Sequence, residues 1–135
     1  MEKTLFIVKP DAVGRNLVGR IIAAIEQGGL TVVALKMTRL TETSAGDFYH
    51  VHKGKEFYGR LVEYMTSDRI VAGVAEGDGA IARLRAICGA TDPAAAAPGT
   101  VRATYGVDLT KNSIHASDAP ATAREEVRFF FPDIV

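Results

Sequence analysis

The run Ile70-Val71-Ala72-Gly73-Val74-Ala75 decides the fold, because it is apolar on both of the faces that a strand presents. A strand of this kind has to be covered on both sides, so we expect residues 70–75 to lie in the centre of a sheet. Residues 4–8 (TLFIV) form a second apolar run, which Pro10 stops. Residues 31–40 and 113–115 give two further strands.

Helical spacing of apolar residues fills most of the chain between these strands. Asn16 is a favourable N-cap for a helix that starts at Leu17 and that glycines 28–29 end. Asp78 is placed to cap a later helix, which Gly89 ends. The remaining helices are expected from Thr41 to about residue 49, over 57–65, and from about Asp118 to 130 with Pro120 in the first turn.

The resulting order is βα, β, short helices, βα, loop, β, α. Two β-α-β halves favour an α+β sandwich of ferredoxin-like type, with a four-stranded antiparallel sheet (βαββαβ) covered by helices. Residues 90–114 have no strong hydrophobic period, and a long irregular loop inside a compact domain is often functional. The length of 135 residues fits one domain, residues 1–135.

Composition narrows the function classes. The chain is 47% hydrophobic with a mean hydropathy of +0.09, which predicts a folded protein. Lys+Arg and Asp+Glu are both 16, and the zero net charge argues against nucleic acid as the main partner while favouring association. The single cysteine, Cys88, predicts a reducing compartment. We expect no signal peptide and no membrane span, and therefore a cytoplasmic protein.

The stretch Asn112-Ser113-Ile114-His115-Ala116-Ser117-Asp118 is the best candidate for chemistry. An imidazole acts as a nucleophile when one nitrogen keeps its lone pair and the other is held as a donor. Ser117 and a glutamate of the following helix, Glu125 or Glu126, are suited to that holding. A lone histidine is more often a satisfied polar residue at a strand end, so His115 decides nothing by itself.

Other phosphate and metal motifs are absent from the sequence. There is no G-x-x-x-x-G-K-[ST] pattern and no G-x-G-x-x-G after the first strand. His50 and His52 do not share a helical face and have no third ligand nearby in sequence, so they are a weak metal candidate.

Four segments follow one another along the chain: Lys9-Pro10-Asp11, Gly89-Ala90-Thr91-Asp92-Pro93, Pro98-Gly99-Thr100-Val101-Arg102 and the stretch around His115. Together they resemble the nucleoside diphosphate kinase family, and the resemblance covers essentially the whole chain. It implies a ping-pong enzyme in which a nucleoside triphosphate such as ATP or GTP phosphorylates a histidine and a nucleoside diphosphate takes the phosphoryl group back.

The resemblance also implies a role for individual residues. His115 is the implied nucleophile, and Glu126 with Ser117 orients its ring. The implied phosphate and ribose ligands are Lys9, Tyr49, Arg85, Thr91, Arg102 and Asn112, while Phe57 stacks on the base beside Leu61 and Leu109. Residues 89–112 are the implied loop of the nucleotide site.

The chemistry of these residues agrees with phosphoryl transfer, which needs positioning and charge neutralisation. Arg85 and Arg102 supply forked donors and Lys9 a point charge. Mg²⁺ bridges phosphate oxygens and needs few protein ligands, so we expect no metal-binding residue of the protein itself. Stacking without edge hydrogen bonds predicts little base selectivity, and the sugar contacts predict tolerance of ribose and deoxyribose.

The sequence departs from the family pattern at a few positions. Ala116 replaces the usual glycine after the histidine, which costs ~1 kcal/mol if φ is positive there and nothing in an ordinary strand. Glu56 replaces a proline, Asp68-Arg69 replaces Gly-Pro, and Leu109 replaces a commoner valine. None of these removes a reacting group, so we expect an active enzyme.

Two other functions are weighed against the kinase. A non-catalytic nucleotide-binding module has no need of the histidine, and nucleic-acid binding is at most secondary for a neutral chain. The resemblance implies a homo-oligomer, either a hexamer or a tetramer built from a shared dimer, and we favour the hexamer slightly. With few residues after Phe131-Pro132, we expect no long C-terminal arm.

Overall fold

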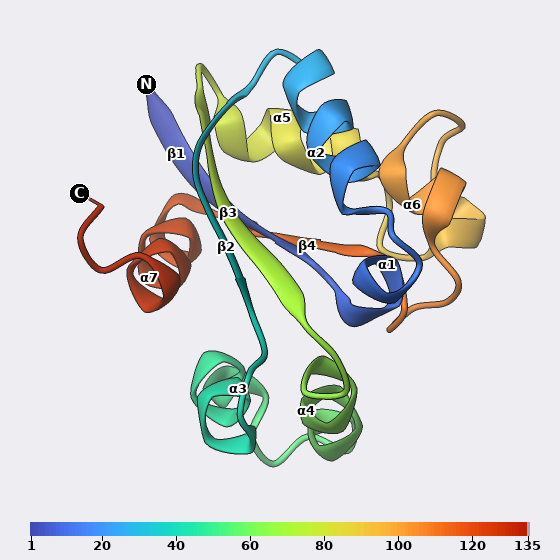
Figure 1. Ribbon diagram of the computed structural model, residues 1–135, viewed down its shortest axis with the longest axis vertical. Helices are drawn as coiled ribbons and strands as arrows, with labels where there is room; N and C mark the ends of the chain where they lie inside the picture. Colours follow the sequence, from blue (N-terminus) through green and yellow to red (C-terminus); the bar gives the residue numbers. More distant parts are fainter. Residues whose placement is uncertain (135) are drawn as a thin grey trace.

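A four-stranded antiparallel sheet in the order β2-β3-β1-β4 forms the middle of the molecule (Figure 1). The computed structural model describes residues 1–134. The strands are β1 (Glu2–Val8), β2 (Thr31–Thr38), β3 (Ile70–Gly77) and β4 (Ile114–Ala116). All three strand pairs are antiparallel, which confirms the predicted ferredoxin-like α+β sandwich.

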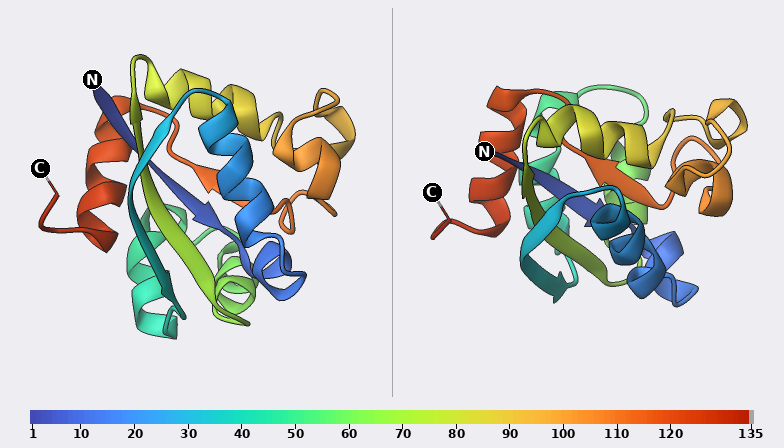
Figure 2. Two further views of the ribbon diagram at one scale, coloured as in Figure 1. Left: turned by 45° about the horizontal axis from the view of Figure 1, so that its top comes forward. Right: turned by 90° about the horizontal axis from the view of Figure 1, so that it is seen from above.

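Helices cover both faces of this sheet, as Figure 2 shows. Helices α2 and α5 pack on one face, while α3, α4 and α7 pack on the other. No helix of residues 1–134 is long and apolar enough to cross a membrane. The helices are α1 (Pro10–Gly14), α2 (Val18–Gln27), α3 (Glu42–Phe48), α4 (Tyr58–Met65), α5 (Ala80–Cys88), α6 (Val101–Tyr105) and α7 (Pro120–Phe130), with short 3₁₀ turns η1 (His50–His52) and η2 (Pro93–Ala95).

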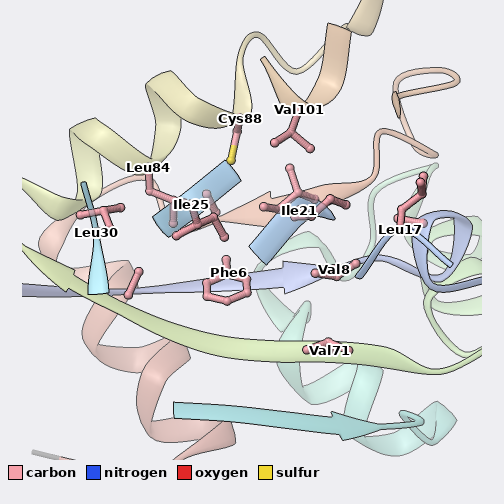
Figure 3. Close-up of a cluster of buried hydrophobic side chains, with 14 of the residues drawn as sticks. Phe6, Val8, Leu17, Ile21, Ile25, Leu30, Val71, Leu84, Cys88 and Val101 are labelled. Carbon is pink, nitrogen blue, oxygen red and sulfur yellow. The ribbon is translucent and has the colours of Figure 1, made fainter. Parts of the chain in front are cut away.

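Two apolar layers follow from the alternation of side chains along each strand. In β1, Phe6 and Val8 point to the α2/α5 face (Figure 3), while Leu5 and Ile7 point to the opposite face. The ring of Phe6 lies over its cross-strand partner Gly73, where a Cβ atom would overlap the ring. Strand β3 lies between β2 and β1, and residues 70–75 are buried with side chains in both layers, which confirms the predicted central strand.

The segment between β1 and α2 differs from its prediction. Pro10 does end the strand, but it also occupies the first turn of α1, a helix that the sequence analysis missed. Asn16 is not the N-cap of α2, which is Leu17: it has a φ of 60° in the turn that ends α1, where its backbone N–H donates to the carbonyl of Val13 at 3.1 Å. Asparagine tolerates this left-handed backbone better than most residues, which explains why it stands there.

The N-terminus of α5 also differs. Asp78 makes no capping contact, and Gly79, with a φ of 60°, is the N-cap. The carboxylate that serves this helix end comes from Glu2, whose Oε1 accepts from the backbone N–H of Ile81 at 2.8 Å. The local sequence suggested Asp78 as the cap, but the pairing of β1 with β3 brings Glu2 to the first turn of α5.

Smaller shifts occur at three other element ends. Ser113 has a φ of 76° and cannot belong to a strand, so β4 begins one residue later than predicted. Strand β2 ends at Thr38, and α7 begins at Pro120 rather than Asp118. The predicted start of a helix at Thr41 is confirmed, since Thr41 is the N-cap of α3. The turn η2 begins at Pro93, with Asp92 as its N-cap.

Candidate active site

His115 owes its position to the pairing of β4 with β1. It lies opposite Ile7, and residues opposite each other in a sheet point to the same face. That face carries α7, and Glu126 of this helix reaches the imidazole. Ile114 and Ala116, one residue to either side, point instead into the α2/α5 layer.

The imidazole of His115 is held from one side only. Its Nε2 lies 2.8 Å from Oε1 of Glu126, and the same oxygen accepts a 2.6 Å hydrogen bond from Oγ of Ser117. Because a carboxylate only accepts, Nε2 carries the proton and Nδ1 keeps its lone pair. The side chain is 23% exposed, so a substrate can reach it. The ring of Phe48 contacts the imidazole edge-on, with 5.7 Å between centroids.

Lys9 stands at the end of β1 with its ammonium group buried. Its Nζ donates to Oδ1 of Asn112 at 2.8 Å and to the carbonyl of Thr110 at 3.3 Å. Burial, together with the neighbouring Arg102 guanidinium, lowers the pKa of Lys9 to about 8. An anionic ligand would relieve this cost, which is the behaviour expected of a phosphate-binding lysine.

Arg102, on α6, is the second buried cation. Its two terminal nitrogens donate to the carbonyls of Gly89 and Ile114 at 2.9 and 2.8 Å, while its Nε finds no partner among residues 1–134. Burial lowers the pKa of Arg102. Arg85 is exposed and donates to the carbonyl of Ala116 at 3.2 Å. Both arginines therefore contact the backbone of β4, on either side of His115.

Tyr49 and Thr91 complete the polar part of the site. The hydroxyl of Tyr49 is buried and without a partner in the described part of the chain. Burial, and then the charge of Glu126, raises the pKa of Tyr49, so the hydroxyl stays a donor. The carbonyl of Thr91 accepts from Nδ2 of Asn112 at 3.0 Å, which ties the start of the loop to its end.

The residues expected to meet a base offer apolar side chains at the start of α4 and in the loop after α6. Phe57 is the N-cap of α4 and is exposed, Leu61 follows one turn later and is partly buried, and Leu109 is exposed. The ring of His52 stands 5.2 Å from that of Phe57 and also faces Tyr49. The ring of His52 therefore lies between the rings of Phe57 and Tyr49. The sequence analysis considered His52 only as a metal ligand and missed these contacts.

Two further groups were missed. Phe48 immediately precedes Tyr49, yet nothing local distinguishes it from a core residue. Asp11 belongs to the segment Lys9-Pro10-Asp11 and could have been singled out there. Its carboxylate accepts a hydrogen bond from Ser113, a residue that lies between Asn112 and His115 in the sequence. Within residues 1–134, no three His, Cys, Asp or Glu side chains gather in a way that could hold a metal ion.

The departure at Ala116 has no backbone cost. Ala116 lies in β4 opposite Phe6, and it is not among the residues with positive φ. The second of the two alternatives for this position, an ordinary strand, therefore holds.

Comparison with known proteins agrees with this geometry. The family model described as nucleoside diphosphate kinase matches residues 2–134. A nucleoside diphosphate kinase of Desulfatibacillum aliphaticivorans is 51% identical over 133 residues, which are 98% of this chain and 96% of that protein.

Solved structures give the same result. The Aquifex aeolicus nucleoside diphosphate kinase superposes with a TM-score of 0.95 at 47% identity, over 99% of each chain. The Halobacterium salinarum enzyme, solved in complex with CDP, has a TM-score of 0.94 at 42% identity and covers 98% of this chain and 88% of its own. The chain therefore belongs to the nucleoside diphosphate kinase family.

Proposed function

We propose that this chain moves the γ-phosphoryl group of a nucleoside triphosphate to a nucleoside diphosphate through a phosphohistidine on His115. Nucleoside diphosphate kinase is the activity of its family. One observation carries the proposal for this residue: Nε2 of His115 is engaged by Glu126, so Nδ1 is the nitrogen with a free lone pair.

The side chains around His115 suit an in-line transfer. Nδ1 forms a bond to the γ-phosphorus as the bond to the bridging oxygen breaks, and the diphosphate leaves with that electron pair. Glu126 stabilises the positive charge that develops on the ring, as a carboxylate does for an imidazolium. Arg102 and Lys9 neutralise charge on the phosphate oxygens, and the Tyr49 hydroxyl donates to one of them. The second half-reaction reverses these steps with a new diphosphate.

Mg²⁺ is the cofactor we propose. The polar end of the site consists of cations, an amide and hydroxyls, and residues 1–134 contain no acidic cluster that would hold the ion. Such a donor set fits an ion carried by the nucleotide phosphates, with water completing its coordination. When bound with the nucleotide, the ion would neutralise negative charge on the phosphates.

Nucleoside di- and triphosphates of several bases are the proposed substrates, ATP and GTP among them. The base end offers the ring of Phe57 and the side chains of Leu61 and Leu109. These apolar groups form no hydrogen bonds to the edge of a base, so they do not distinguish one base from another. The relative from H. salinarum was solved in complex with CDP, a pyrimidine nucleotide, which supports including pyrimidine nucleotides among the substrates. Thr91 and Asn112 suit contacts to phosphate and sugar.

We further propose that the chain acts as one catalytic domain, residues 1–135, in the cytoplasm and as a homo-oligomer. The family match over residues 2–134 supports a single domain, and the lone buried thiol of Cys88 fits a reducing compartment. Edge strand β2 leaves Val33, Leu35 and Met37 about half exposed, which supports self-association. Of the two assemblies that the resemblance implies, we propose the hexamer.

The test is incubation with γ-labelled ATP followed by an alkaline quench. Histidine phosphate survives base and is lost in acid, whereas serine phosphate behaves in the opposite way. We expect an acid-labile label on His115 that added GDP discharges as GTP. A protein that binds nucleotide but takes up no label would contradict the proposal and favour a binding module.

A further inference from the structure

The carboxylate of Asp11 joins three segments that are far apart in sequence. Its Oδ2 accepts from Oγ of Ser113 at 3.1 Å and from Arg15 at 3.1 Å, and its Oδ1 accepts from the hydroxyl of Tyr64. The same tyrosine oxygen accepts from the backbone N–H of Asp11 at 3.0 Å. The side chain of Asp11 is only 7% exposed, so this network is largely shielded from water.

Ser113 is the residue in the network with an unusual backbone. Its φ of 76° lies in the left-handed region that residues other than glycine seldom adopt. The residue is fully buried, and its hydroxyl donates to Asp11. A conformation of this kind persists only when its surroundings hold it, and here the bond to Asp11 supplies such a hold.

The turn at Ser113 connects the pair Asn112 and Lys9 to His115. Directly before it, Asn112 holds the ammonium group of Lys9, and two residues after it stands His115. The carbonyl of Ser113 also accepts from the backbone N–H of Lys9 at 3.0 Å. The conformation of Ser113 therefore sets the separation between the phosphate-binding amide and lysine on one side and the nucleophile on the other.

We propose that Asp11 is a positioning residue, which holds Ser113 in its left-handed conformation and thereby fixes Lys9 and Asn112 relative to His115. This inference deepens the proposed function and rests on it. Asp11 needs no contact with the nucleotide to act in this way. Through Tyr64 it also ties the turn to α4, the helix that Phe57 caps at the base end.

The experiment compares four single variants with the wild type. Asp11→Ala removes the carboxylate altogether, because the amide oxygen of an asparagine can still accept from Ser113, and Ser113→Ala removes the hydroxyl. Ser113→Gly also lacks the hydroxyl but adopts positive φ without strain. Asp68→Ala is the matched control: it makes the same chemical change at an exposed carboxylate that lies outside the network.

Two quantities are measured for each variant: the Kd for GDP by calorimetry, and KM and kcat for transfer from ATP to GDP. We expect Asp11→Ala and Ser113→Ala each to weaken GDP binding and raise KM about tenfold, since both remove the side-chain hydrogen bond that holds the turn. Ser113→Gly should stay within about threefold of the wild type. The double variant Asp11→Ala with Ser113→Ala should be no worse than the weaker single variant, because both changes remove the same hydrogen bond. Asp68→Ala should match the wild type.

A merely structural role makes a different prediction. The variants would then lower the melting temperature while Kd and KM at 25 °C stayed unchanged, or the two effects would add in the double variant. Either result would overturn the inference, as would a Ser113→Gly variant as weak as Ser113→Ala. The calorimetric Kd keeps this test separate from the proposed function: a wild type that binds GDP but transfers nothing would refute only the latter.

Discussion

The two ends of the candidate site are built in opposite ways. At the phosphate end, Lys9, Arg102 and Asn112 are 8%, 6% and 1% exposed, and each is held by hydrogen bonds. At the base end, Phe57 and Leu109 are 41% and 62% exposed and offer apolar surface.

Under the proposed function, this difference separates recognition of the phosphates, which all substrates share, from recognition of the base, which varies. Buried, preorganised donors discriminate strongly, because leaving them unpaired is costly. An exposed ring stacks on any base with similar strength. We therefore expect the site to be strict about the phosphates and permissive about the base.

The largest effect is expected from His115→Ala at the polar end. The variant lacks the nucleophile, so exchange should fall at least about 10⁴-fold while GDP still binds, because the cations remain in place. Coupled assay of transfer, with calorimetry for binding, checks both parts. Retained turnover would show that the phosphoryl group takes another route.

Glu126→Gln should have the next largest effect. An amide in this position no longer stabilises the imidazolium charge, so we expect kcat to fall about a hundredfold with little change in KM. Glu125→Gln changes the adjacent, exposed carboxylate on the same helix and serves as the matched control. A loss of equal size in both variants would point to α7 as a whole and not to the His115 contact.

The buried lysine predicts a pH dependence of the phosphate end. The pKa of Lys9 lies at about 8, below its usual value of 10.5, because of burial and the Arg102 charge, with Asp11 and Asp108 acting in the opposite direction. Lys9 is cationic below this pKa and loses its charge above it. We therefore expect kcat/KM to fall about tenfold per pH unit above 8. In Lys9→Arg this limb should move beyond pH 10, and an unchanged limb would assign it to another group.

Phe57→Ala is expected to give the smallest effect. Loss of a partly exposed stacking ring is worth ~1 kcal/mol, or about fivefold in Kd. The factor should be similar for ADP, GDP and CDP in calorimetric titrations. A loss confined to one base would mean that the base end recognises the hydrogen-bonding edge of that base. The contrast between the two ends would then no longer hold.

The sequence by itself determined the sheet and the catalytic candidates. The all-apolar run at residues 70–75 required cover on two faces, and the structure provides it. The resemblance covered the whole chain, and the structure brings His115, Glu126 and Ser117 into one hydrogen-bonded group. Such patterns can be read from the sequence because strand alternation and motif spacing depend only on residues that are close together in the chain.

Only the tertiary structure decided which distant groups serve each other. Glu2 instead of the neighbouring Asp78 satisfies the start of α5, and Asp11 is bonded to Ser113 and Tyr64. Ala116 was ambiguous until its place in β4 was known. These outcomes depend on the register of the sheet and on which helix covers which face, and no local rule of capping or propensity contains that information.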